Sequence, residues 1–327
     1  MNPALFLICA AGFALLYYGA EWLVKGSSNL AGDLGIPAIV IGLTVVAFGT
    51  SMPELVVSLI SSMQGKSMIA VGNVIGSNIC NMALVLGMSA FLQPIHCHRS
   101  IVRRDLPLML AISLFLLLIS FNSVIGRFEG AILFSGIILY TIFNYRSAIT
   151  ESNQKKGHMA SCIEMEVKGI GCVSSRRNQI LLIATGVVGV AAGAEMVVYS
   201  ATKIMTMLGV SEKFIGLTIV AFGTSLPELA TSVVAALRKE MDISVGNLVG
   251  SNVFNILSVL GASSLAAPIH IPGGFFQSGL IIDYLAMLLV SLLPWLMMKK
   301  TATLTKKDGA VLLACYAGYM VWLTLSQ

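Results

Sequence analysis

Two glutamates, Glu54 and Glu228, occupy the same place in two nearly identical segments of the chain. Residues 42–55 read GLTVVAFGTSMPEL and residues 216–229 read GLTIVAFGTSLPEL, so twelve of the fourteen positions are identical. Both segments are apolar and contain no Lys or Arg. In a membrane-spanning segment such a carboxylate is costly and is a candidate functional group. Each glutamate is therefore expected either to be protonated or to meet a bound cation.

The residues before each glutamate predict an interruption of the helix. Pro removes a main-chain donor and obstructs the helix, and Gly weakens it. An interruption releases main-chain carbonyl groups, which are tolerated at bilayer depth only where something satisfies them. The candidate carbonyls are those of Ala47, Thr50, Ala221 and Thr224. A cation could satisfy them. A competing interpretation is that Ser51-x-x-Glu54 and Ser225-x-x-Glu228 are capping boxes that begin a second half-helix.

A second repeated block supplies further oxygen atoms. Residues 72–87 read GNVIGSNICNMALVLG and residues 246–261 read GNLVGSNVFNILSVLG, and the offset between these copies equals that of the first block. Two residues four apart share one helix face, and such pairs occur in both copies: Ser77 with Asn81, and Ser251 with Asn255. Carboxylates, amides, hydroxyls and carbonyls are hard ligands that suit Ca²⁺ or Na⁺ and not zinc or copper. Polar residues that only join helices by hydrogen bonds are the alternative.

The composition indicates an all-α polytopic membrane protein. Of 327 residues, 57% are hydrophobic and only 11% are charged, and the mean hydropathy is +0.89. Soluble domains carry about 25% charged residues. The sequence has no nucleophile–base pair, phosphate loop or cofactor motif, so we expect neither an enzyme nor a cofactor. The net charge of +5 is not a nucleic-acid signal here. The six cysteines form no CxxC pair, and we expect free thiols.

The hydropathy predicts ten transmembrane helices as two repeats of five, residues 1–145 and 179–327, joined by a linker at 146–178. Because five is odd, the second copy would cross the membrane in the opposite sense, which gives inverted-topology repeats with broken helices at the midplane. The predicted spans are 3–24, 37–63, 69–91, 106–121, 129–145, 179–200, 214–237, 243–266, 277–297 and 309–325.

The distribution of basic residues predicts the orientation. With the N-terminus outside, sixteen Lys and Arg residues fall on the inner side and four on the outer side. The positive-inside rule favours this arrangement. We therefore expect the linker to be cytoplasmic and the protein to lie in the cell membrane, plasma or inner, in contact with lipid. Asp283 is expected to pair locally or to face a cavity, and Glu21 to be an interfacial anchor. The oligomeric state is not predicted.

With these paired GTSxPE and GSNxxN motifs, the sequence resembles the sodium/calcium exchanger family of the calcium/cation antiporters. The two blocks resemble its alpha-repeats, and the resemblance covers all but the linker. It implies that Glu54 and Glu228 are the central Ca²⁺ and Na⁺ ligands. It also implies that oxygens of Thr50 and Thr224, and the carbonyls of Ala47 and Ala221, join them. The first and sixth spans would slide to alternate access.

The resemblance further implies that four serines line flanking Na⁺ positions: Ser51, Ser225, Ser77 and Ser251. Asn81 and Asn255 would lie beside the central position. Some family members, potassium-dependent ones among them, carry Asp at one or both of these sites. Two asparagines here disfavour K⁺ co-transport and leave the charge of the site at −2.

The sequence therefore predicts a secondary antiporter that exchanges Na⁺ for Ca²⁺ by alternating access. A Ca²⁺/H⁺ antiporter that uses the same glutamates is the nearest alternative. A cation channel and a structural membrane protein are further alternatives from other classes.

Overall fold

The computed structural model describes residues 3–151, 171–208 and 221–325, and these are mostly helical. The chain forms two compact units. Unit 1 comprises Met1–Thr50 and Arg146–Asn247, and unit 2 comprises Ser51–Tyr145 and Leu248–Gln327. Each unit therefore combines a segment from each half of the sequence. These units differ from the two sequence repeats, which are predicted to be separated by residues 146–178. That division stays a prediction.

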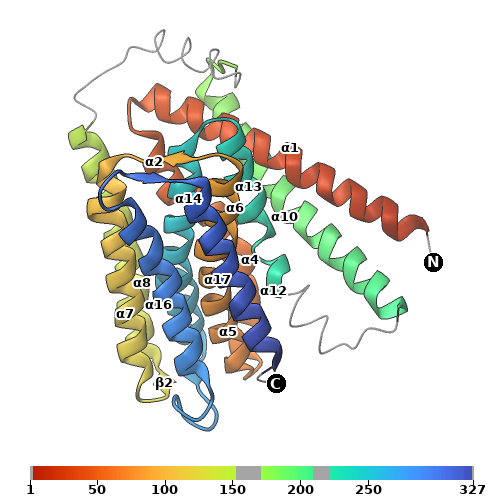
Figure 1. Ribbon diagram of the computed structural model, residues 1–327, viewed down its shortest axis with the longest axis vertical. Coiled ribbons are helices and arrows are strands. Elements are labelled where there is room, and N and C mark those ends of the chain that lie inside the picture. The colour runs from red at the N-terminus through yellow and green to blue at the C-terminus, as the bar shows by residue number, and fades with distance from the viewer. Residues whose placement is uncertain (1–2, 152–170, 209–220, 326–327) are drawn as a thin grey trace. The chain divides into compact units, whose positions relative to one another are not determined.

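Unit 1 is built around two 32-residue helices (Figure 1). Helix α14 begins in unit 1 and ends in unit 2, and helix α8 begins in unit 2 and ends in unit 1. Its elements are α1 (Pro3–Leu34), α2 (Ala38–Ile41), the π-helical segment η1 (Gly42–Val46), α3 (Ala47–Thr50), α10 (Arg176–Met207), α12 (Ala221–Gly223), α13 (Leu226–Leu237) and α14 (Met241–Phe254).

Unit 2 contains the remaining helices and four two-residue strands. The elements are α4 (Met52–Met63), α5 (Ser67–Ile79), η2 (Cys80–Val85), α6 (Leu86–Leu92), β1 (Ile95–His96), η3 (Ile101–Asp105), α7 (Leu106–Ser120), β2 (Val124–Ile125), α8 (Arg127–Glu151), η5 (Asn255–Leu260), α15 (Gly261–Ala266), β3 (Ile269–His270), α16 (Leu280–Met298), β4 (Thr303–Leu304) and α17 (Lys306–Leu325).

Among the described residues, seven helices are long and apolar enough to cross a membrane, or eight if Ala38–Thr50 and Met52–Met63 count as one broken span. The predicted span 106–121 corresponds to α7, of 15 residues, and the second half of the predicted span 214–237 corresponds to α13, of 12 residues. Residues 214–220 lie outside the described residues. The protein is thus a multi-pass helical membrane protein, and the count of ten remains a prediction.

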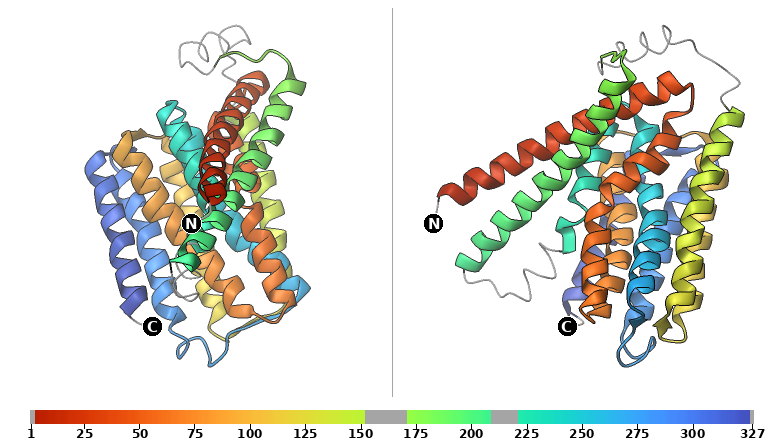
Figure 2. Two further views of the ribbon diagram at one scale, coloured as in Figure 1. Left: turned by 90° about the vertical axis from the view of Figure 1, so that its right-hand side faces the viewer. Right: turned by 180° about the vertical axis from the view of Figure 1, so that it is seen from behind.

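Helices α1 and α10 pack side by side, as both views of Figure 2 show. Glycines at the contact allow the main chains to approach closely, as in other membrane helix pairs. A Cβ atom on Gly19 would lie 2.7 Å from the main-chain nitrogen of Val190, and one on Gly186 would lie 2.6 Å from that of Leu23. Since no side chain fits there, glycine is required at these positions.

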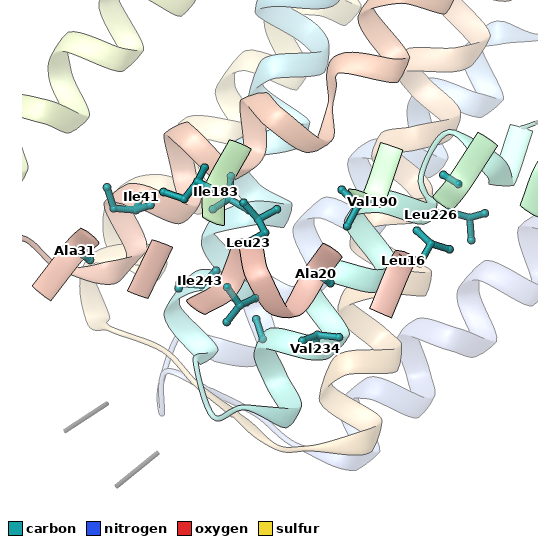
Figure 3. Close-up of a cluster of buried hydrophobic side chains, with 14 of the residues drawn as sticks. Leu16, Ala20, Leu23, Ala31, Ile41, Ile183, Val190, Leu226, Val234 and Ile243 are labelled. Atoms are coloured by element: carbon teal, nitrogen blue, oxygen red, sulfur yellow. The ribbon is translucent and has the colours of Figure 1, made fainter. Parts of the chain in front are cut away.

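A cluster of buried apolar side chains continues this contact within unit 1 (Figure 3). Leu23 and Ala20 of α1 are fully buried, and so is Val190 of α10. Helices α13 and α14 add Val234 and Ile243. The cluster ties α13, which carries Glu228, to the α1–α10 pair.

A contact that a residue of the second copy makes with the first copy is matched by the same contact from the first copy to the second. Gly12 and Gly186 are corresponding residues of the two copies, and so are Gly19 and Gly193. A Cβ atom on Gly186 would lie 2.8 Å from the carbonyl oxygen of Gly19, and one on Gly12 would lie 3.0 Å from that of Gly193. These are corresponding contacts in which the copies have changed places.

The strands of unit 2 pair in the same way. Strand β1 pairs antiparallel with β4, and β2 pairs antiparallel with β3. In each pair, one strand comes from the first half of the sequence and the other from the second half, and β1 and β3 occupy corresponding positions of the two copies. Neither half of the sequence completes either strand pair by itself.

The expectation of free cysteines is confirmed for four of them: Cys9, Cys80, Cys97 and Cys315. It is wrong for Cys172, which is disulfide-bonded. The lack of a CxxC spacing excludes only close pairs, so it did not constrain this residue. Cys162 lies outside the described residues.

Candidate functional site

The helix is interrupted before both glutamates, as predicted. Helix α3 ends at Thr50 and α4 begins at Met52, and Ser51 between them has φ −83° and ψ 6°. Ser225, which precedes α13, has φ −88° and ψ 4°. Both serines thus lie in the sparsely populated bridge region, and a proline follows at the second helical position in each copy. The two copies share one local backbone conformation.

The capping-box interpretation is wrong for the serines. Neither Ser51 nor Ser225 makes a side-chain hydrogen bond that caps the following helix. With proline in the first turn, the helix has one fewer main-chain N–H to satisfy. Capping therefore does not account for these hydroxyl groups.

Both glutamates lie in the first turn of the helix that follows the interruption, and both are fully buried. Glu54 is in α4 and Glu228 is in α13, and each residue is 0% exposed. The N-terminal end of a helix carries partial positive charge, which favours a negative group there. This placement stabilises the ionised form of each carboxylate, and a cation nearby would stabilise it further.

In unit 1, a chain of hydrogen bonds fixes Thr50 at the interruption. The Thr50 hydroxyl donates to Asn247 Oδ1 at 3.0 Å, and it also lies 3.4 Å from the carbonyl oxygen of Ala47. Asn247 Nδ2 donates to Ser232 Oγ at 3.0 Å. The hydroxyl proton of Thr50 is thus directed at neighbouring acceptor atoms. Ser225 Oγ is buried and has no hydrogen-bond partner among the described residues.

In unit 2, helix α5 holds Glu54. The Ser77 hydroxyl lies 3.4 Å from Glu54 Oε1. Asn73 Nδ2 lies 3.3 Å from the main-chain oxygen of Glu54 and donates to Ser58 Oγ at 2.9 Å. Main chain and side chain of the glutamate are thus both held by the adjacent helix.

Four buried asparagines of unit 2 form a second network. Asn81 Nδ2 donates to Asn252 Oδ1 at 3.1 Å, and Asn255 Nδ2 donates to Asn78 Oδ1 at 3.0 Å. Asn81 and Asn255 stand at the beginnings of the π-helical segments η2 and η5. Such segments are frequent at functional sites because the extra residue per turn redirects side chains. Among the described residues, the Oδ1 atoms of Asn81 and Asn255 accept no hydrogen bond.

The twelve predicted site residues fall equally into the two units. Unit 1 holds Ala47, Thr50, Ala221, Thr224, Ser225 and Glu228. Unit 2 holds Ser51, Glu54, Ser77, Asn81, Ser251 and Asn255. The structure brings Ser77 to Glu54 within unit 2, and the side chain of Ala221 lies outside the described residues. A single site made from both sets remains a prediction.

The sequence reasoning missed four residues that hold this machinery in place: Asn73, Ser58, Asn247 and Ser232. Asn73 and Asn247 are corresponding residues of the two copies, as are Ser58 and Ser232, so the same bond occurs in both copies. The signal was present, because each asparagine follows the first glycine of the second repeated block. Each serine lies four residues after its glutamate and therefore on the same helix face.

The other acidic residues singled out from the sequence have local partners. Asp283 accepts a hydrogen bond from the Tyr319 hydroxyl at 2.9 Å, so the prediction of local pairing is confirmed. Glu21 accepts a hydrogen bond from Arg238 Nε at 2.6 Å, and this bond raises the pKa of Arg238. Among the described residues, no three His, Cys, Asp or Glu side chains converge as a metal site would require.

The fold is that of a multi-pass helical membrane protein, and comparison with known proteins gives the family. A model of the sodium/calcium exchanger protein family matches residues 4–146 and 178–325. The chain is 35% identical over 314 residues to inner membrane protein YrbG of Escherichia coli (strain K12), a match that covers 96% of this chain and 94% of that protein. It is 30% identical to the sodium/calcium exchanger MaX1 of Methanosarcina acetivorans, with 97% of each chain covered.

A solved structure supports the same assignment. The sodium-calcium exchanger NCX_Mj, soaked with 10 mM Na⁺ and zero Ca²⁺, matches with a TM-score of 0.83 and 31% identity, over 98% of this chain and 99% of that one. This chain belongs to the sodium/calcium exchanger protein family. The resemblance seen in the repeated blocks is confirmed, and both family and fold are those of transporters rather than enzymes.

Proposed function

We propose that this protein is a secondary antiporter that exchanges Na⁺ for Ca²⁺ across the membrane. The observation that carries the proposal is the burial of Glu54 and Glu228 at corresponding positions of the repeat. An ionised carboxylate at bilayer depth is tolerated where a charge of opposite sign accompanies it. The transported cations supply that charge, and as substrates they make a cofactor unnecessary.

The proposed ligands are the twelve oxygen-bearing residues predicted from the sequence. Two carboxylates match one Ca²⁺ in formal charge, and neutral oxygens bring the number of ligands toward the six to eight that Ca²⁺ takes. Two or three Na⁺ ions could occupy the same oxygens in place of one Ca²⁺. Exchange follows when one set of ligands serves either ion in turn. Three Na⁺ for one Ca²⁺ would move one net charge, worth about 2.3 kcal/mol per 100 mV.

The proposed architecture is ten spans in two inverted repeats. The exchanged contacts Gly186–Gly19 and Gly193–Gly12 support it, because a two-fold relation between copies makes each such contact occur twice. The same holds for the paired strands. In this proposal α1 and α10, the first helix of each copy, slide together to open the site to either side.

The test is ⁴⁵Ca²⁺ uptake into proteoliposomes loaded with Na⁺, diluted into Na⁺-free buffer, with choline-loaded vesicles as the control. We expect uptake that requires the Na⁺ gradient and that responds to membrane potential. A pH gradient that drives uptake without Na⁺ would instead establish Ca²⁺/H⁺ exchange, and unitary currents in a planar bilayer would establish a channel. Undiminished transport after Glu54→Gln and Glu228→Gln together would contradict the proposed site.

We also propose a cell-membrane location with the N-terminus outside and the 146–178 linker cytoplasmic. The excess of Lys and Arg on one side supports this orientation. A reporter that is active only in the cytoplasm, inserted near residue 160, tests it. Activity of that fusion is expected, and activity of an N-terminal fusion would contradict the proposed orientation.

A further inference from the structure

The hydrogen bonds among the four asparagines of unit 2 begin at main-chain atoms. Asn252 Nδ2 lies 3.4 Å from the carbonyl oxygen of Asn78, and Asn78 Nδ2 lies 3.3 Å from the carbonyl oxygen of Asn252. A main-chain carbonyl group can only accept. The amide nitrogen of each of these two side chains is therefore directed at the other main chain, and its Oδ1 atom must point elsewhere.

These two Oδ1 atoms in turn orient the next pair of amides. Asn252 Oδ1 receives Asn81 Nδ2 at 3.1 Å, and Asn78 Oδ1 receives Asn255 Nδ2 at 3.0 Å. If the Asn81 amide were turned over, its Oδ1 atom would face Asn252 Oδ1, and both atoms are acceptors. If Asn252 were turned over as well, its Oδ1 atom would face the carbonyl oxygen of Asn78, which is also an acceptor. The direction of both chains of hydrogen bonds is thus fixed by the backbone.

The consequence is an excess of acceptors. With their nitrogens engaged, Asn81 and Asn255 present their Oδ1 atoms away from the network, and both residues are 0% exposed. Neither atom accepts a hydrogen bond from any described residue. A buried amide oxygen without a donor is unfavourable, and a cation satisfies it without adding charge to the site.

We infer that Asn78 and Asn252 are positioning residues that hold the amide oxygens of Asn81 and Asn255 as cation ligands. This inference rests on the proposed function, because the cation is the transported one. The two positioning residues are identical in the two copies, so both amide oxygens are set by the same device. Asn78 and Asn252 act through their neighbours and touch no ion themselves.

A double-mutant cycle on Ca²⁺ binding tests the inference. Equilibrium ⁴⁵Ca²⁺ binding is measured on the purified full chain for wild type, Asn252→Leu, Asn81→Leu and the double variant. Loss of a residue that orients a metal ligand typically weakens metal binding 10- to 100-fold. We expect the Kd to rise about tenfold in each single variant and no further in the double variant. Asn144→Leu is the matched control, since Asn144 is equally buried and its Nδ2 donates to the carbonyl oxygen of Tyr140 within α8.

Several results would overturn the inference. The first is an unchanged Kd for Ca²⁺ in Asn81→Leu or Asn252→Leu. The second is a rise in the Kd of the double variant equal to the product of the two single rises. The third is a rise in the Kd of Asn144→Leu as large as that of Asn252→Leu. If Asn252→Leu does not fold, Asn78→Leu with Asn255→Leu provides the same cycle with the copies exchanged. A wild-type chain that binds Ca²⁺ but shows no Na⁺-driven uptake would refute the proposed exchange and leave this cycle readable. A wild-type chain that binds no Ca²⁺ would overturn both.

Discussion

Neutralising one buried glutamate should affect Ca²⁺ and Na⁺ unequally. Glu54→Gln keeps the size and one oxygen of the side chain but removes one of the two negative charges. At about 4 Å and an effective dielectric constant of about 20, two unit charges interact by about 4 kcal/mol. A divalent ion at the same distance therefore loses about twice as much interaction energy as a monovalent ion. The Ser77 hydroxyl is neutral and lies 3.4 Å from Oε1, so it cannot replace the lost charge.

Glu54→Gln should weaken ion binding but stabilise the fold of the protein when no ion is bound. Glu54 is 0% exposed, so its charge is desolvated whenever no cation is bound. Glutamine removes that penalty, and we expect the ion-free variant to unfold at a higher temperature than ion-free wild type. Wild type should gain stability on adding Ca²⁺, by about 2.7 kcal/mol at a concentration one hundred times the Kd. The variant should gain little over the same range.

The assay is thermal unfolding of purified protein at increasing Ca²⁺ or Na⁺, followed by the uptake measurement in vesicles. Glu228→Gln should behave in the same way, because it is the corresponding residue of the other copy. Glu129→Gln is the control, since that carboxylate accepts a hydrogen bond from the Gly126 main-chain nitrogen and lies outside the proposed ligand set. A Glu54→Gln variant that is stabilised by Ca²⁺ as strongly as wild type would refute the reasoning.

Three other predictions concern packing and local bonds. Gly186→Leu should abolish the α1–α10 contact and prevent recovery of monodisperse protein, because even a Cβ atom would lie 2.6 Å from a main-chain nitrogen. Thr50→Val should lower the unfolding free energy by about 1–3 kcal/mol, since Asn247 Oδ1 loses its donor; Ca²⁺ uptake at subsaturating concentration should fall as well. Arg238→Ala should change the unfolding free energy by less than about 1 kcal/mol and leave uptake unchanged, because the ion pair with Glu21 is partly exposed.

The interruptions of the helices and the burial of the glutamates were predictable from the sequence, because Pro, Gly and an acidic residue in an apolar run have few structural solutions. The family was predictable too, since two separated blocks at one offset are a specific signal. The roles of Asn73 and Asn247 were not. A buried asparagine can bind an ion, join two helices or orient another side chain, and only the partners of its amide decide which. Periodicity also cannot distinguish a π-helical segment from an α-helix over five or six residues.

The interleaving of the two copies gives the proposed site a dependence on residues outside the proposed ligand set. Each compact unit takes segments from both halves of the sequence, and the side-chain amides of Asn78, Asn81, Asn252 and Asn255 bond between the copies in two matched pairs. Asn78 and Asn252 each donate to the main chain of the other, which makes the pair self-complementary. A change in one copy should therefore disturb a proposed ligand in the other: loss of Asn252 would release Asn81, and loss of Asn78 would release Asn255. Such cross-dependence favours keeping both asparagines in each copy, as the two blocks do here.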